Sequence, residues 1–348
     1  MRLRTVAESW LERLVLKLNQ VPEPLIETQM AFNMARTIMT GVKLGVFEAM
    51  AEGPAPALQV ASLCQCDAAA MEKLLNTLVA CNYLRWRRDG YVLTPKSRKW
   101  LLRRSPHNLC DKMLFQFYEW DIVSGYEEYV RTGKSVTSHA SVVEDDYWST
   151  YQRGMYSLAR LWAKDVAARC PVPAGARDLL DIGGSHGYYS VCLCQRYPRL
   201  NGVILDLPNA VKYAAPLLAA EGMGNRITHR AEDVLTATLQ PQSVDVVFMS
   251  QLVHHFTDEQ NRQLLINITQ ALRPQGVCVV LDYFGPGPAG KGDQAAALLD
   301  LYFATLSASG IWSADTLQDW FRATGLMISA PIRFRNMPGG ALVVGVKG

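Results

Sequence analysis

The chain has 348 residues, of which 49% are hydrophobic and 19% charged, and its formal net charge is +3. An apolar half can bury a substantial core, which excludes a disordered or fibrous protein. The nearly neutral balance gives no support to a protein whose main work is binding nucleic acid or an anionic membrane. The length suggests two domains.

The N-terminus lacks the apolar stretch and cleavage site of a signal peptide, and apolar runs are broken by charges before reaching about 18 residues. Eight cysteines without zinc-finger spacing fit small buried thiols in a reducing compartment. We therefore expect a cytoplasmic protein without a membrane partner.

Residues 1–170 are predicted to be mostly helical. Leu25–Met50 has apolar residues at helical spacing, and Asp67 is a suitable N-cap for a following amphipathic helix. The segment 84–93 alternates around Asp89-Gly90 and predicts a short β-hairpin. Helix, turn, helix and hairpin together indicate a winged helix. The apolar helices at Trp10–Leu18 and Met30–Met50 favour a homodimer.

Residues 171–348 are predicted to form an α/β domain. Predicted strands alternate with helical segments, which indicates a mostly parallel sheet with helices on both faces. Two later strands are expected to form an antiparallel pair at the C-terminal edge. The predicted strands are Asp178–Ile182, Gly202–Leu205, Ile227–Arg230, Val244–Ser250, Gly276–Asp282, Met327–Phe334 and Ala341–Lys347.

A glycine-rich turn follows the first of these strands. Gly183, Gly184 and Gly187 lie in Asp181-Ile-Gly-Gly-Ser-His-Gly, where a tight turn lets a ligand approach the backbone. The second strand ends in Asp206, a carboxylate placed to accept both hydroxyls of a ribose. Together they predict a nucleoside site, although Asp206 could instead merely cap the next helix. The Gly-Lys-Ser/Thr sequence of a triphosphate-binding loop is missing, so triphosphate chemistry is unsupported.

Further markers follow the third and fourth strands, namely Glu232-Asp233 and His254 with Phe256 and Asp258-Glu259. In this order, the markers resemble the class I S-adenosylmethionine-dependent O-methyltransferases of the caffeate, hydroxyindole and polyketide-tailoring type. The resemblance covers nearly the whole chain. It implies a Rossmann-like methyltransferase domain with a seven-stranded, mostly parallel sheet and an antiparallel C-terminal hairpin. A winged-helix domain for dimerisation and lid formation precedes it.

The resemblance also implies roles for individual residues. The cofactor would be S-adenosyl-L-methionine, with Gly183 at its methionine part, Asp206 at the ribose, and Asp233 and Val234 around the adenine. Ser250 falls where the family often has a lysine near the cofactor. His254 aligns with the general base, and Met155 with a methionine that clamps the substrate.

The chemistry of methyl transfer to a phenol suits a histidine base. A phenol with a pKa near ~10 is a poor nucleophile at neutral pH, and a histidine can remove its proton. His255 could be the base instead, or both histidines could be structural. Neighbouring residues point about 100° apart at a helix start, so one metal ion would not easily bind both, and we expect no catalytic metal.

Two departures from the family pattern stand out. The region Thr305–Asp315 lacks the glutamate that orients the histidine in plant members, and Asp300 could take that role or be an ordinary surface carboxylate. His186 replaces the usual threonine of the glycine turn and could contact the cofactor or cap locally.

The aromatic segments around Tyr118 and Tyr147, together with Trp312, could form walls for a flat, apolar small-molecule acceptor or simply be core. Three functions are consistent with the sequence. The first is O-methylation in secondary metabolism, and the second keeps the cofactor for C- or N-methylation or for non-methylating chemistry. The third is a winged-helix DNA-binding regulator, although the helix Asp67–Cys81 is poorly equipped to read bases.

Overall fold

The computed structural model describes residues 5–135, 142, 144–285, 294–307, 309–337 and 339–348. The chain forms two compact units, one ending at Phe117 and the other running from Tyr118 to Gly348. The sequence placed the change of domain at residue 170, whereas packing places it at residue 117. The reason is α10 (Asp145–Arg169), which contacts α11 (Tyr188–Arg196) and α12 (Pro208–Ala220) of the second unit.

The N-terminal unit contains the expected winged helix. Asp67 Oδ1 accepts a hydrogen bond from Ala70 N at 2.8 Å and caps α6 (Ala68–Ala80), as predicted. Strands β1 (Leu84–Arg87) and β2 (Gly90–Leu93) pair antiparallel after it. The core of this unit lies between these elements and the short helices. The helices are α1 (Trp10–Lys17), α2 (Glu23–Leu25), α3 (Ala31–Lys43), α4 (Val46–Ala49), α5 (Ala57–Leu63) and α7 (Pro95–Trp100), with a π-helical turn η1 (Ile26–Met30).

The C-terminal unit is built on a sheet with the order β5-β4-β3-β6-β7-β10-β8, and β9 pairs with β10. The first five strands in this order are parallel and β10 is antiparallel to its neighbours, which confirms the predicted fold class. The predicted strand Met327–Phe334 is divided into β8 and β9. The strands are β3 (Asp178–Ile182), β4 (Asn201–Asp206), β5 (Ile227–Ala231), β6 (Val244–Ser250), β7 (Leu272–Tyr283), β8 (Leu326–Ile328), β9 (Ile332–Arg333) and β10 (Gly340–Lys347).

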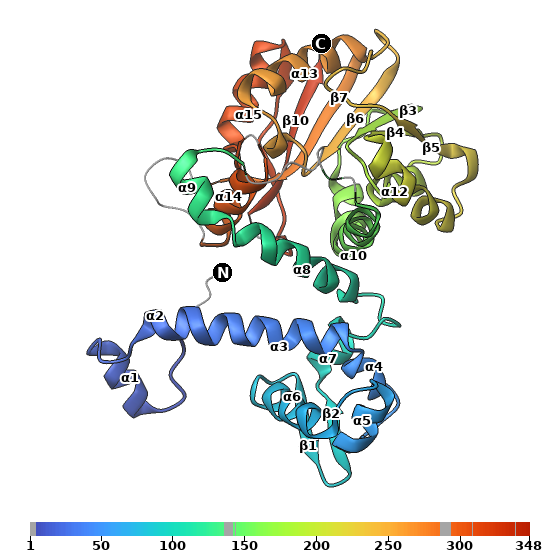
Figure 1. Ribbon diagram of the computed structural model, residues 1–348. Coiled ribbons are helices and arrows are strands. Elements are labelled where there is room, and N and C mark those ends of the chain that lie inside the picture. The colour runs from blue at the N-terminus through green and yellow to red at the C-terminus, as the bar shows by residue number, and fades with distance from the viewer. Residues whose placement is uncertain (1–4, 136–141, 143, 286–293, 308, 338) are drawn as a thin grey trace. The chain divides into compact units, whose positions relative to one another are not determined.

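Successive side chains along the strands point to opposite faces of the sheet, so they pack into two hydrophobic cores, one on each face. Leu179 and Phe248 pack with α10 and α11, while Leu180 and Val247 pack with α13 (Asp258–Ala271) and α15 (Ala314–Ala323). Figure 1 shows α10 and α12 on one side of the sheet and α13 and α15 on the other. The remaining helices are α8 (Cys110–Val123), α9 (Tyr126–Thr132) and α14 (Gln294–Leu306).

The chain order reverses between β3 and β6, which lie side by side at the centre of the sheet. Ligands of open α/β sheets bind beyond the carboxyl ends of the strands at such a reversal. Gly183, Asp206 and Ser250 all stand at strand carboxyl ends near this point. The fold thus gathers the residues that the sequence predicts for a nucleoside site.

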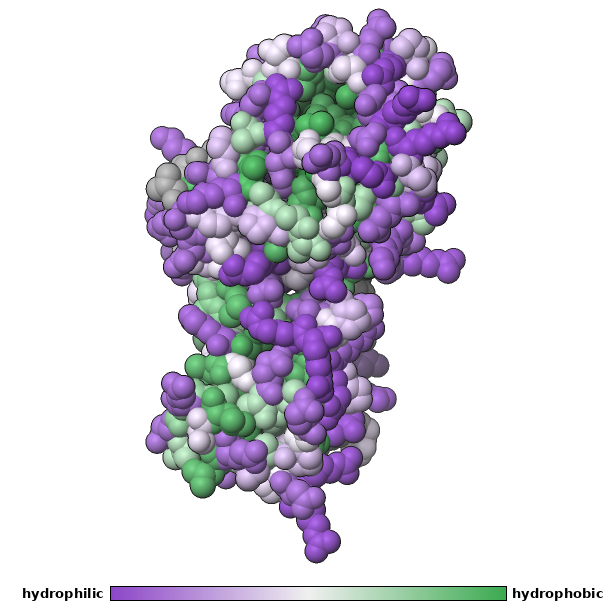
Figure 2. Space-filling model, turned by 90° about the vertical axis from the view of Figure 1, so that its right-hand side faces the viewer, coloured by the Kyte–Doolittle hydropathy of each residue, from purple (hydrophilic) through white to green (hydrophobic). Residues whose placement is uncertain are grey.

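The surface is mixed in character. On the face shown in Figure 2, hydrophobic side chains lie among hydrophilic ones on both units. Within the parts of the chain that the structure describes, none of the helices has the length and apolar character needed to cross a bilayer.

Candidate active site

The turn after β3 has the backbone conformation that its glycines predict. Gly183 and Gly187 have φ values of +66° and +73°, in the left-handed region. A Cβ on Gly183 would lie 2.8 Å from Leu252 Cδ1, and one on Gly187 would lie 2.5 Å from Ile204 Cδ1. Neither position accommodates a side chain without movement. The turn therefore keeps a bare backbone at the carboxyl edge of the sheet.

Ser185, at the middle of this turn, is held by three different elements. Its N–H donates to Asp206 Oδ2 at 2.8 Å, and its carbonyl oxygen lies 2.9 Å from His229 Nε2. Its hydroxyl donates to Gln152 Oε1 of α10. Asp206 Oδ1 also accepts from Leu207 N at 2.7 Å. These contacts orient the Asp206 carboxylate at the end of β4.

Burial dominates the electrostatics here. It raises the pKa of Asp206 to about 6, against two backbone hydrogen bonds that lower it. It raises the pKa of Asp181 to about 7, although Ser190 Oγ donates to Asp181 at 2.6 Å. Burial also lowers the pKa of His186 to about 3, so this ring is neutral. Because burial disfavours the ionised form of these carboxyl groups, a ligand with hydrogen-bond donors or a positive charge would be stabilised beside them.

Near the glycine turn, two buried polar atoms lack a hydrogen-bond partner among the described residues. They are Asp181 Oδ1, before the glycine turn, and Gln152 Nε2, whose amide oxygen contacts Ser185. Buried polar atoms are normally paired, so a bound ligand is expected to donate to Asp181 Oδ1 and to accept from Gln152 Nε2. Together with the bare backbone, this fits a ligand that has a nucleoside and an amino-acid end. His186 Nδ1 accepts from Tyr188 N at 3.1 Å, which agrees with a local capping role.

The residues predicted to frame an adenine lie after β5. Val234 is 8% exposed, whereas Asp233 is exposed and its Oδ1 accepts from Leu235 N at 2.9 Å. Glu232 is paired with Arg230 at 2.5 Å and its N–H donates to Asp206 O at 3.0 Å. Ser250 ends β6 and is half-buried.

His254 lies in a 3₁₀ turn, Val253–His255, directly after β6. Its Nδ1 is 2.9 and 3.1 Å from the two carboxylate oxygens of Asp282, and both side chains are 1% exposed. The ring of Phe303 covers the imidazole at a centroid distance of 3.8 Å. Because a carboxylate only accepts hydrogen bonds, Nδ1 of the neutral ring carries the proton and Nε2 has the lone pair. The pair can therefore act as a general base at Nε2.

Sequence reasoning missed Asp282. The available signal was an acidic residue near the carboxyl end of the otherwise apolar β7, which is a strand end of the kind that carries ligands and catalytic groups. Asp300, which the sequence suggested for this role, instead accepts from Ile311 N at 2.7 Å through Oδ1. The structure thus provides His254 with a carboxylate partner from β7 rather than from α14.

Four side chains hold the backbone of the histidine turn. Trp312 Nε1 and Asn261 Nδ2 donate to Val253 O at 3.0 and 2.9 Å. Ser307 and Ser309 donate to His254 O at 2.9 and 3.0 Å. Trp312 was predicted as a wall of the acceptor site, and its indole N–H is used to support this turn.

A cluster of phenols lies in the same unit. Tyr118 meets Tyr147 edge-on at 5.4 Å, and Tyr147 stacks on Tyr151 at 6.1 Å. Tyr302 donates to Glu119 at 3.2 Å and its ring contacts Phe303 at 5.3 Å. Burial raises the pKa of these hydroxyl groups above that of a free phenol, so they remain protonated donors. Met155, four residues after Tyr151 on α10, is half-buried.

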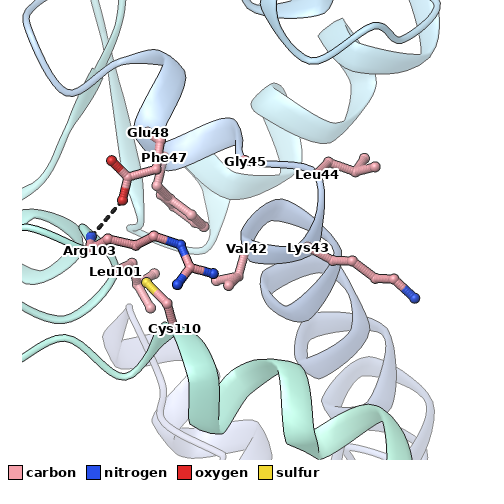
Figure 3. Close-up of a pocket in the computed structure, with 9 residues that line it drawn as sticks. All are labelled: Val42, Lys43, Leu44, Gly45, Phe47, Glu48, Leu101, Arg103 and Cys110. Carbon is pink, nitrogen blue, oxygen red and sulfur yellow. Dashed lines mark hydrogen bonds between the residues drawn. The ribbon is translucent and has the colours of Figure 1, made fainter. Parts of the chain in front are cut away.

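A separate pocket of about 210 Å³ lies in the N-terminal unit (Figure 3). Arg103 N donates to Glu48 Oε1 at 2.5 Å beside it, and Lys43 points away from it. Burial raises the pKa of the lining Cys110 to about 11, so its thiol is a poor nucleophile. None of the predicted site residues lines this pocket. Among the described residues, His, Cys, Asp and Glu form no group of three that could hold a metal ion.

The comparisons with known proteins match this architecture. An O-methyltransferase domain model matches residues 124–319, and an O-methyltransferase dimerisation domain model matches residues 26–103. The chain is 26% identical to a 3-hydroxy-5-methyl-1-naphthoate 3-O-methyltransferase of Streptomyces sahachiroi, over 93% of this chain and 95% of that protein. It is 24% identical to the N,N-dimethyltransferase OxyT of Streptomyces rimosus, over 93% and 96%.

Human N-acetylserotonin methyltransferase, solved in complex with SAM, has the same fold with a TM-score of 0.82. It is 17% identical and matches over 99% of both chains. The domain model alone spans more than half of the sequence, from α9 to α15. The matched range lies within the unit that contains the glycine turn and the His254–Asp282 pair. The chain belongs to the O-methyltransferase family and is an enzyme of that class.

Proposed function

We propose that this protein transfers the methyl group of S-adenosyl-L-methionine to a phenolic hydroxyl of a small aromatic acceptor of secondary metabolism. The observation that carries the proposal is the buried His254–Asp282 pair in the unit that also holds the glycine turn and the oriented Asp206. A relative from Streptomyces that methylates a naphthoate hydroxyl supports the acceptor class.

The chain's own residues would hold the cofactor at the carboxyl edge of the sheet. Gly183 borders its methionine part, Asp206 accepts from the ribose hydroxyls, and Asp233 and Val234 frame the adenine. Ser250 lies near the cofactor at the end of β6. When bound, the cofactor supplies an electrophilic methyl group on a sulfonium. Most of the acceleration then comes from aligning the acceptor with that group.

His254 removes the proton of the acceptor hydroxyl at Nε2. Asp282 keeps Nδ1 protonated and stabilises the imidazolium that forms. Since a phenol with a pKa near ~10 is mostly protonated at neutral pH, this step contributes about 10²–10⁴-fold to the rate. Met155 and Tyr118 contact the acceptor from α10 and α8, among aromatic rings that suit a flat, apolar molecule. Trp312 supports the site from behind the histidine turn.

Calorimetric titration with S-adenosylhomocysteine tests the cofactor site. We expect micromolar binding that Asp206→Ala weakens at least about 100-fold, because the variant loses an oriented carboxylate with two ribose partners. Asp319→Ala is the matched control, since this carboxylate is exposed on α15. Failure of the intact protein to bind would refute the proposal.

Product analysis tests the reaction. With methyl-labelled cofactor and a panel of phenols and anilines, we expect label on oxygen and one S-adenosylhomocysteine per product. OxyT, a similar N,N-dimethyltransferase, makes nitrogen the alternative accepting atom. Label on nitrogen or carbon, or product without S-adenosylhomocysteine, would refute transfer to a hydroxyl.

We also propose that the protein is a cytoplasmic homodimer. Apolar side chains are exposed on α1 and on the π-helical turn and α3 that follow it, including Trp10 at 76%, Leu14 at 46%, Met30 at 51% and Phe32 at 49%. Such a surface is typical of an interface, and the dimerisation model spans α3. The eight free cysteines, several of them with pKa values raised by burial, support a reducing compartment.

Sedimentation velocity measures the oligomeric state. We expect a dimer that Phe32→Glu with Leu14→Glu converts to a monomer, whereas Val130→Glu, an exposed control on α9, leaves it intact. A wild-type monomer at micromolar concentration would refute the homodimer.

A further inference from the structure

Helix α10 lies against the glycine turn along one of its faces. Gln152 and Tyr156, one helical turn apart, both face it. Gln152 Oε1 accepts from Ser185 Oγ, and the ring of Tyr156 contacts those of His186 and Tyr188 at 5.6 and 5.3 Å. The side chain of Gln152 is therefore anchored to the turn by a defined contact.

Only half of the Gln152 amide is used in this contact. The residue is 0% exposed, and its Nε2 has no hydrogen-bond partner among the residues that the structure describes. An unpaired buried N–H₂ group destabilises the protein unless a ligand accepts from it. A fully buried amide that is oriented at one end and unpaired at the other is therefore a preorganised hydrogen-bond donor.

The contacts of Ser185 indicate which end of a ligand this donor meets. The Ser185 N–H is bound to Asp206, the proposed ribose partner, whereas its hydroxyl extends to Gln152. The turn between Gly183 and Gly187 contacts Asp206 through the Ser185 N–H and packs on Asp181, whose Cγ would lie 2.4 Å from a Cβ on Gly184. With the ribose at Asp206 and the methionine part at Gly183, as proposed above, the amino-acid end of the cofactor would lie along this turn, and its only anionic acceptor is the α-carboxylate.

We propose that Gln152 binds the α-carboxylate of S-adenosylmethionine through Nε2 while its Oε1 fixes Ser185 in the turn. This inference rests on the proposed function, because it assumes that cofactor. Gln152 is then a specificity-determining residue for the amino-acid end of the ligand, supplied from outside the glycine motif.

Two ligands that differ only at that end test the proposal by calorimetry. S-adenosylhomocysteine has the amino-acid end, and 5′-methylthioadenosine lacks it. In Gln152→Glu an oxygen can still accept from Ser185, but the donor is replaced by an anion that repels a carboxylate. We expect affinity for S-adenosylhomocysteine to fall about 10- to 100-fold and affinity for 5′-methylthioadenosine to change less than about twofold. Gln152→Met, of similar size and uncharged, removes the donor by a second route if the charged variant does not fold.

The control is Gln263→Glu, the same change at an exposed position of α13. Equal weakening of both ligands would overturn the proposal, because Gln152 would then act only by positioning Ser185. Unchanged binding of S-adenosylhomocysteine by folded Gln152 variants would also overturn it. A wild-type protein that binds neither ligand would overturn the proposed function itself, which distinguishes the two failures.

Discussion

Asp282→Asn perturbs the proposed base without removing the histidine. Asp282 Oδ1 accepts from Tyr283 N at 2.8 Å, while both of its oxygens lie within 3.1 Å of His254 Nδ1. In the variant the amide oxygen is needed by the Tyr283 N–H, so the amide nitrogen faces Nδ1. An N–H group there favours the tautomer with a lone pair on Nδ1 and a proton on Nε2. The base at Nε2 is thereby lost.

The expected magnitude follows from the loss of the base, because a positioned general base contributes about 10²–10⁴-fold. We expect kcat at pH 7 to fall within that same range of about 10²–10⁴-fold. Binding of S-adenosylhomocysteine should stay within about twofold, since the glycine turn and Asp206 are untouched.

A pH profile separates this mechanism from a general loss of structure. A phenol with a pKa near ~10 ionises without help as the pH rises, so the deficit should shrink about tenfold per pH unit between about 7 and 10. Asp300→Asn is the matched control, because among the described residues its side chain accepts from Ile311 N and is not the partner of His254. A deficit that does not change with pH, or an equal deficit in Asp300→Asn, would refute the reasoning.

Three further outcomes follow from the geometry. Gly187→Ala should lower Tm by roughly 3–10 °C, because left-handed backbone and a 2.5 Å approach to Ile204 cost about 1–3 kcal/mol; a shift below about 1 °C would contradict this. Folded Asp181 binds a proton up to about pH 7 and unfolded Asp only up to about pH 3.8, so stability falls as pH rises through this window. Between pH 4 and pH 8, the free energy of unfolding of Asp181→Asn should therefore fall by up to about 4 kcal/mol less than that of the wild type, as measured by urea unfolding. An unchanged pH dependence would contradict this prediction. Trp312→Phe should lose about 1 kcal/mol of stability and reduce kcat more than it changes KM, whereas a change in KM alone would favour direct contact with the acceptor.

The sequence alone determined the class of fold and the position of the glycine turn. Strand β3 and strand β6 have the predicted bounds, and Asp67 caps its helix as expected. These features depend on local patterns, namely the alternation of apolar residues, capping and the glycines of a tight turn. Gly183 has the left-handed φ for the same local reason.

Only the tertiary structure decided which distant side chains meet. Asp282 is 28 residues from His254, and no local pattern relates them. They meet because β6 and β7 are neighbouring parallel strands whose carboxyl ends share one edge of the sheet. Gln152 likewise reaches Ser185, 33 residues later, because α10 packs on the sheet through its buried small residues rather than joining the N-terminal unit. Strand order and helix packing result from burying both faces of the sheet at once, and this requirement is not visible in any short segment of the chain.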